Sequence, residues 1–128
     1  MLLVCRFVVP PSDQEAFTAR ARRALTLLTA APGCLGGDLG RSVDDPGRWV
    51  LAVRFASVDA YRRALSPFEV REHVVPLLSE ALADEPSTYE TLVTGAGGEL
   101  TEQQSLLAGH GPGQPSGAAP RSASNVRR

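Results

Sequence analysis

Two stretches of closely spaced apolar residues stand out in the chain, and each is followed by a segment with helical periodicity. They cover residues 2–9 and 49–55, and both are rich in the Val, Leu and Phe residues that favour strands. Pro10 and Pro11 end the first stretch, because proline cannot donate a hydrogen bond to a neighbouring strand. These two stretches are therefore predicted to be the main buried strands of a sheet.

The segments that follow them carry helix signals. Ser12 stands three residues before Glu15, a capping-box spacing, and apolar residues then recur at helical intervals up to the Pro-Gly pair at 32–33. After the second strand, Ser57 is a typical N-cap for a helix ending near residue 65. Residues 66–81 continue with an apolar stripe, which predicts a further helical stretch.

Two weaker strands complete the pattern. The glycine-containing "CLGGDLGRS" precedes the turn "DDPGR", and "STYETLV" comes last. The resulting order, βαββαβ, predicts a ferredoxin-like α+β domain with a four-stranded antiparallel sheet and helices on one face. Strands one and three should be the central neighbours in this sheet, which agrees with their strongly apolar composition.

Alternation along these two strands assigns their faces. The more apolar set should lie beneath the helices; it consists of Leu3, Cys5, Phe7, Val9, Trp49, Leu51, Val53 and Phe55. The opposite face still carries Leu2, Val4 and Val50, which is too apolar for a surface left in water. We therefore expect a homodimer that forms through the helix-free sheet face.

Composition changes after the last predicted strand. Residues 1–93 have the makeup of one globular domain, whereas residues 94–128 are rich in Gly, Pro, Ser and Ala with few large apolar side chains. Such a segment buries too little surface to offset the entropy lost on ordering. We expect a disordered C-terminal tail, with a short helix over residues 99–108.

Charge and cysteine content restrict the environment and the partners. The net charge of -1 argues against nucleic acid or an anionic membrane as the main partner, because both are held through excess Lys and Arg. The apolar start is shorter than the roughly 20 residues that a membrane span needs, and it lacks a basic leader. Cys5 and Cys34 should sit two strand spacings apart, about 9.5 Å, which is too far for a disulfide. We expect a cytoplasmic protein with free thiols, in which burial raises the pKa of Cys5 and leaves it unreactive.

Four segments together resemble the antibiotic biosynthesis monooxygenase family over about residues 1–93. They are "PGCLGG", "VRFAS", "VDAYRRALSPFEVREHVVPLL" and "YETL". The resemblance implies a dimeric α+β barrel with a ligand cavity between helices and sheet. Members of the family oxidise anthrone or quinol-type substrates with oxygen and no metal or flavin, degrade haem, transform other small molecules, or have no demonstrated activity. In this chain Phe55, Arg63 and Phe68 stand where many members carry Trp or His, so the usual polar set is thinned.

Two residues are candidates for catalysis. His73 borders the apolar stripe of its helix, and Tyr61 could donate a hydrogen bond to a phenolic substrate. Each also has a plain structural interpretation, His73 as a solvated helix-edge residue and Tyr61 as core packing. Aromatic side chains are the candidates for substrate binding; they are Phe7, Phe17, Trp49, Phe55, Phe68 and Tyr89. No metal-ligand spacing and no phosphate-binding loop appears in the sequence.

The resulting hypothesis is a cofactor-independent monooxygenase that oxidises a small aromatic, anthrone- or quinol-like substrate, with molecular oxygen as co-substrate. The alternative is a non-catalytic dimeric module that binds a small hydrophobic or aromatic ligand. A third possibility is haem binding or degradation. It would place His73 on the iron, although Arg63 and Cys5 stand where that branch has Trp and Asn.

Overall fold

The computed structural model describes residues 1–105. The chain divides between Glu90 and Thr91 into two compact units. The first unit contains a four-stranded antiparallel sheet in the order β2-β3-β1-β4. Its strands are β1 (Leu2–Val8), β2 (Cys34–Arg41), β3 (Arg48–Phe55) and β4 (Thr88–Tyr89). The prediction that the first and third strands are central neighbours is confirmed.

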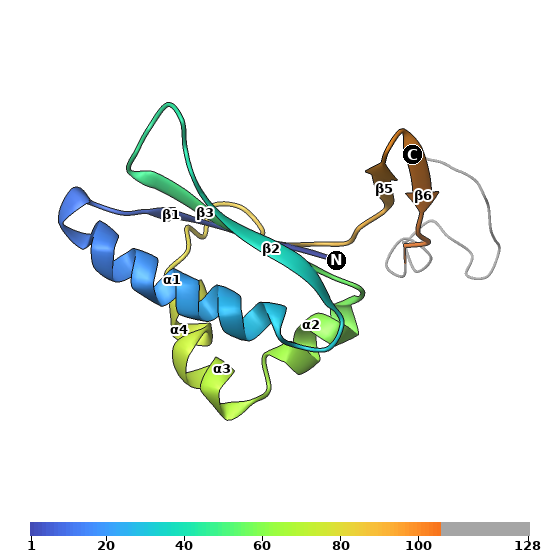
Figure 1. The fold of residues 1–128 in the computed structure, drawn as a ribbon, viewed down its shortest axis with the longest axis horizontal. Helices are drawn as coiled ribbons and strands as arrows, with labels where there is room; N and C mark the ends of the chain where they lie inside the picture. Colours follow the sequence, from blue (N-terminus) through green and yellow to red (C-terminus); the bar gives the residue numbers. More distant parts are fainter. Residues whose placement is uncertain (106–128) are drawn as a thin grey trace. The chain divides into compact units, whose positions relative to one another are not determined.

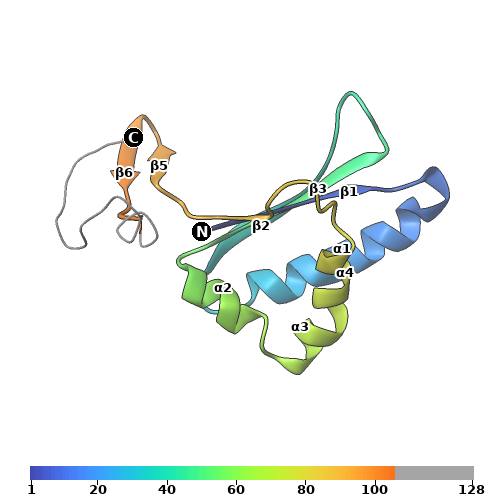
Figure 2. The ribbon, with the colours of Figure 1, turned by 180° about the vertical axis from the view of Figure 1, so that it is seen from behind.

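All the helices lie on one face of this sheet, as both ribbon views show (Figures 1 and 2). They are the short 3-10 helix η1 (Pro11–Asp13), α1 (Gln14–Thr29), α2 (Val58–Ala64), α3 (Phe68–His73) and α4 (Val75–Ser79). The ferredoxin-like α+β fold expected from the sequence is thus confirmed. No helix in residues 1–105 is long and apolar enough to cross a membrane.

The hydrophobic core lies between the sheet and the helices. Its strand residues are the set that alternation placed there, and each except Trp49 is fully buried; Trp49 is half-buried and packs against the core. From the helices, Leu28, Val74 and Leu77 are completely shielded from solvent. On the opposite face Val4 and Val50 are half-buried and Val8 is exposed. The face assignment made from the sequence is therefore confirmed.

The start of α1 differs from the prediction. Residues Pro11–Asp13 form a 3-10 turn, and α1 begins at Gln14 with Asp13 as an N-cap that makes no side-chain hydrogen bond. The capping box expected from Ser12 is therefore wrong. The cap expected at Ser57 is confirmed, since its Oγ accepts a hydrogen bond from the backbone N–H of Ala60 at 3.0 Å.

The second helical region is broken rather than continuous. α3 ends at His73 and α4 begins at Val75, with Val74 as the cap between them. Pro76 lies in the first turn of α4, and proline has no backbone N–H to offer to the preceding turn. The break therefore falls where a continuous helix would need that hydrogen bond.

The last strand of the sheet is shorter than expected. The sequence predicts a strand over residues 87–93, but only Thr88–Tyr89 pair regularly with β1. The segment before them is attached by separate backbone hydrogen bonds, from Leu82 N–H to the Arg6 carbonyl and from Val4 N–H to the Ser87 carbonyl. Asp84, Glu85 and Pro86 do not suit a regular ladder.

The second unit contains a two-stranded hairpin made of β5 (Val93–Ala96) and β6 (Glu99–Glu102). Gly97 and Gly98 both have positive φ angles, which a two-residue hairpin turn of this kind requires. The short helix expected over 99–108 is wrong for the residues described, because 99–102 form a strand. The remainder of the expected tail, from residue 106, lies outside the described residues, and the domain boundary at 93 stays a prediction.

Candidate functional site

Tyr61 lies on α2 and packs against the sheet. Its ring meets Phe55 edge-on, with the ring centroids 5.5 Å apart. Burial raises the pKa of Tyr61, and the negative charge of a neighbouring Cys5 thiolate acts in the same direction. The phenol therefore stays neutral over the physiological range and can act as a hydrogen-bond donor. We call Cys5, Phe55 and Tyr61 the Tyr61 cluster.

The cysteine of this cluster, Cys5, is expected to be unreactive. Burial raises the pKa of Cys5 to about 11, although a hydrogen bond with the side chain of Ser87 works in the opposite direction. A thiol that stays protonated is a poor nucleophile, so the expectation of an unreactive Cys5 is supported. Both Cys5 and Cys34 are free, which confirms that no disulfide joins them.

His73 is the last residue of α3 and its side chain is 33% exposed. Its Nε2 lies 3.5 Å from a carboxylate oxygen of Glu72, an ion pair only when the imidazole is protonated. The structure gives it no hydrogen bond or ion pair to Tyr61. The two candidate catalytic residues are therefore not joined into one polar constellation within the described residues.

The six aromatic residues expected to bind substrate fall into separate groups. Phe7 and Phe17 have ring centroids 5.0 Å apart, and Phe17 meets Trp49 at 5.5 Å. Phe55 belongs to the Tyr61 cluster. Phe68 is 67% exposed, and Tyr89 is 40% exposed with its hydroxyl donating to the Pro86 carbonyl. The structure thus does not bring the six side chains into one cavity, and their role in binding stays a prediction.

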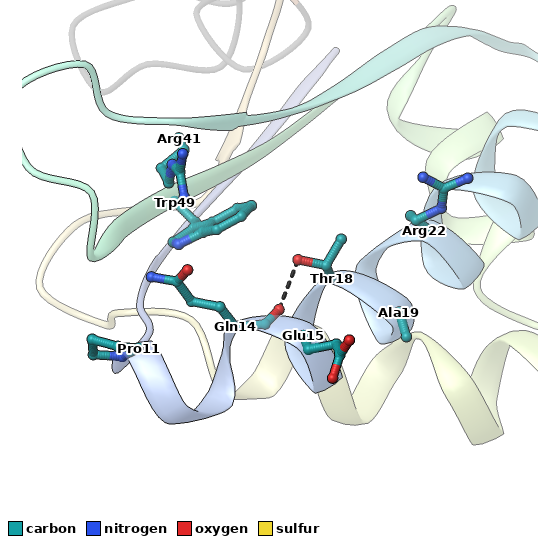
Figure 3. A pocket seen from close by; sticks show the side chains of 8 residues that line it. All are labelled: Pro11, Gln14, Glu15, Thr18, Ala19, Arg22, Arg41 and Trp49. Atoms are coloured by element: carbon teal, nitrogen blue, oxygen red, sulfur yellow. Dashed lines mark hydrogen bonds between the residues drawn. The ribbon is translucent and has the colours of Figure 1, made fainter.

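A groove opens along the seam between α1 and β2. It has two adjoining parts, of about 620 and 510 Å³, and Thr18 and Arg22 line both. We call this the α1–β2 groove. The part shown in Figure 3 is lined by Pro11, Gln14, Glu15, Thr18, Ala19, Arg22, Arg41 and Trp49.

Arg41 and Trp49 form the wall of this groove. They are opposite each other in the β2–β3 register, and the guanidinium carbon of Arg41 lies 5.3 Å from the centre of the indole ring. Such a cation–π contact holds the arginine in a defined orientation. Sequence reasoning singled out Trp49 but missed Arg41. Counting cross-strand partners outward from the "DDPGR" turn would have paired the two.

No group of three or more His, Cys, Asp or Glu side chains within residues 1–105 is arranged to hold a metal ion. The polar groups of the Tyr61 cluster are a phenol and a thiol, while the lining of the α1–β2 groove includes two arginines, a glutamine, threonines and the acids Glu15 and Asp38. The first region suits hydrogen bonding to a neutral or weakly charged aromatic ligand. The second suits an anion.

Comparison with known proteins identifies the class to which this fold belongs. Residues 1–74 match the family model described as antibiotic biosynthesis monooxygenase. Because the match covers more than half of the chain, the protein belongs to this family. No match was found among curated protein sequences.

Solved structures with the same fold include three useful relatives. SnoaB, a cofactor-independent oxygenase from Streptomyces nogalater solved as a mutant, is 26% identical with a TM-score of 0.54; the alignment covers 63% of this chain and 82% of SnoaB. Rv0793 from Mycobacterium tuberculosis is 25% identical, with a TM-score of 0.54 and coverage of 66% and 84%. A conserved protein from Methanosarcina mazei Go1 is 18% identical, with a TM-score of 0.56 and coverage of 66% and 82%.

Proposed function

We propose that this protein is a cofactor-independent monooxygenase that oxidises a small aromatic, anthrone- or quinol-like substrate with molecular oxygen. Membership of the antibiotic biosynthesis monooxygenase family and similarity to an oxygenase described as cofactor-independent support the reaction class. The single observation in this chain that carries the proposal is the half-buried, neutral Tyr61 phenol packed against Phe55.

The proposed chemistry relies on the substrate. A CH₂ group conjugated with a carbonyl through an aromatic ring, as in an anthrone, loses a proton, and the resulting carbanion transfers electrons to O₂ to give, after protonation, a hydroperoxide. Loss of water then leaves a new carbonyl, so that CH₂ and O₂ become C=O and H₂O. The protein has to exclude water and stabilise the enolate oxygen, which suits a neutral phenol donor in an apolar setting. His73 remains the candidate for proton exchange at the exposed edge.

A second candidate function is a non-catalytic module that binds a small ligand. The observation that favours it is the filling of the space between helices and sheet. Phe7, Phe17 and Phe55 are all buried in the core, in positions where side chains could instead have lined a cavity. A family member without the usual polar residues and with a filled interior could bind a ligand without transforming it.

Oxygen uptake with a panel of anthrones and hydroquinones separates the two candidates. The wild-type protein is expected to consume oxygen with at least one of them, and Tyr61→Phe is expected to lower kcat by about 10- to 100-fold because the enolate loses its donor. Tyr89→Phe is the matched control: it keeps the aromatic ring and removes only a hydroxyl that already donates to the Pro86 carbonyl, so it should leave kcat unchanged. Saturable binding without any oxygen uptake across the panel would support the module instead.

We also propose that the protein is a homodimer formed through the helix-free sheet face. Val4 and Val50 on this face are half-buried and Val8 is exposed, and no helix of the first unit covers them (Figures 1 and 2). An apolar sheet face of this kind is stabilised by burial against a second copy.

A further inference from the structure

The lining of the α1–β2 groove includes a hydrogen-bond donor that has no acceptor in the described part of the chain. The indole Nε1 of Trp49 is buried and has no hydrogen-bond partner within the described residues. In Figure 3 this nitrogen faces the side chain of Gln14, which also lines the groove. Because a buried donor without an acceptor lowers stability, its presence beside a groove calls for an explanation.

The two arginines of the groove also lack a carboxylate partner within residues 1–105. Arg22 lines both parts of the groove, and its guanidinium forms no ion pair with the residues described. Arg41 rests on the face of Trp49 and likewise has no carboxylate partner there. Two other arginines of the first unit, Arg6 and Arg20, do form ion pairs with carboxylates. Arg22 and Arg41 can therefore pair with an anion that enters the groove.

The net charge of the groove and its apolar lining indicate which class of ligand it can bind. The charged residues that line the larger part of the groove are Arg22, Arg41 and Glu15, which leaves one net positive charge. Asp38 lines the smaller part, but it is opposite Ala52 in the β2–β3 register and so belongs to the helix-free face of the sheet. A monoanion matches this charge, whereas a phosphate dianion would be repelled more strongly by Glu15. Pro11, Ala19 and the edge of Trp49 add apolar surface that suits a flat ring.

We propose that the α1–β2 groove binds a small aromatic monocarboxylate. Arg22 receives the carboxylate, because it stands where the two parts of the groove join and is free to form a bidentate pair. Arg41 and Trp49 form the wall beside the ring, and Arg41 adds to the positive field. The site is separate from the Tyr61 cluster, so it does not depend on the proposed oxygenase activity.

The test uses the single tryptophan of the chain as a local reporter. The full-length protein is titrated with sodium benzoate while Trp49 emission is followed, and with benzamide, a neutral compound of the same shape. Benzoate should give a saturable change with half-saturation near or below about 1 mM, a range that so small a ligand can reach. Benzamide should bind at least about 10-fold more weakly because it lacks the charge.

Matched arginine variants sharpen the result. Arg22→Gln should weaken benzoate binding at least about 10-fold, while Arg23→Gln, the same change at the next residue of α1 and outside the groove lining, should leave it unchanged. Arg41→Gln should have a smaller effect. Tyr61→Phe should bind benzoate like the wild type, which keeps this result independent of oxygenase activity.

Three results would overturn the proposal. They are the absence of a saturable emission change, equal binding of benzamide and benzoate, and equal binding by the Arg22→Gln and Arg23→Gln proteins. Far-UV circular dichroism of each variant shows whether the fold is retained. The indole N–H resonance of Trp49 gives a second readout, and it should shift over the same range of benzoate concentration as the emission does.

Discussion

The two ends of β3 carry different chemistry on the same face of the strand. At one end Phe55 packs against Tyr61, whose phenol also interacts with Cys5, in a largely buried, uncharged cluster. At the other end, six residues or about 20 Å away, Trp49 meets Arg41 in an open groove that contains charged side chains. Burial at the first end keeps the titrating groups in their neutral forms. Exposure at the second allows the arginines to stay charged without a partner.

The difference arises from what covers each end. Ser57 starts α2 directly after Phe55, so the helix folds back over its own strand. Gly33 makes this packing possible, because a Cβ at that position would lie 2.6 Å from the Cβ of Ala60. At the Trp49 end, α1 runs alongside β2 and leaves the groove between them. The contrast shows that neighbouring aromatic residues on one strand can serve separate sites.

The largest expected effect comes from removing a buried side chain at the Phe55 end of β3. Phe55→Ala should lower the free energy of unfolding by about 3–5 kcal/mol, because it leaves a cavity in a shielded part of the core. Phe68→Ala is the control, since its side chain is largely exposed, and it should change stability by less than about 0.5 kcal/mol. Urea unfolding measures both. Similar losses for the two variants would mean that Phe55 is not packed as described.

The raised pKa of Cys5 predicts a loss of stability in alkali. Unfolding restores an ordinary thiol, with a pKa near 9, whereas the folded value is about 11. Between these values the native state holds a proton that the unfolded state has released, so stability falls as pH rises, by about 2–3 kcal/mol in total. Tyr61, whose pKa is also raised, adds a fall in the same direction at higher pH.

Urea unfolding between pH 8 and 11 measures this effect. Cys5→Ala should remove most of the fall, at some loss of packing, whereas Cys34→Ala should keep it. An equal fall in both variants would show that the buried end does not hold Cys5 in its neutral form.

The opposite, helix-free face of the sheet offers a third test. Val4→Glu places a charge on the helix-free face, opposite Ala52 in β3, and should weaken the proposed dimer at least about 10-fold, because the carboxylate would be buried without a cation across from it. Val43→Glu is the control, since Val43 is 99% exposed in the loop before β3. Analytical ultracentrifugation gives the dissociation constants. A wild-type protein that stays monomeric at high concentration would contradict the proposed dimer.

The smallest effect concerns an exposed ion pair, which sets a scale for surface charges. Arg20 donates two hydrogen bonds to Glu80, at 3.0 and 2.7 Å, and so connects α1 to the end of α4. Both side chains are substantially exposed, so Arg20→Gln should cost less than about 1 kcal/mol. This hydrogen-bonded pair lowers the pKa of Glu80, so its contribution is present at neutral pH and is lost as acid protonates the carboxyl.

A double-mutant cycle with Glu80→Gln measures the coupling. Arg23→Gln is the matched control for loss of a positive charge on α1. A coupling energy of several kcal/mol would contradict the expectation that exposed ion pairs on α1 contribute little to stability.

Sequence reasoning recovered most of the fold because its signals are local and repeated. Alternation on β1 and β3 identified the buried face, and the serine before α2 identified its cap. Prediction from the sequence was less successful where a single residue interrupts a periodic pattern. Pro76 interrupts a helix whose apolar stripe is continuous, and the cap expected at Ser12 gives way to a 3-10 turn.

The candidate site could be predicted less well than the fold from the sequence. Aromatic residues can be counted in a sequence, but the count does not say which of them meet. Phe68 and Phe55 are alike in composition, yet one is exposed on α3 and the other is buried against Tyr61. Arg22 and Arg41 carry no signal of their own, since solvated arginines are common on helices and edge strands.

By itself the sequence determined the order of strands and helices, the buried face of the sheet and the family, because each depends on periodicity or on short motifs. Only the tertiary structure decided that the Tyr61 cluster and the α1–β2 groove are separate, and that Trp49 leaves its N–H without a partner. Those features depend on which side chains from distant segments come within a few ångströms. That proximity depends on how the helices pack on the sheet, so it cannot be predicted from a local sequence pattern.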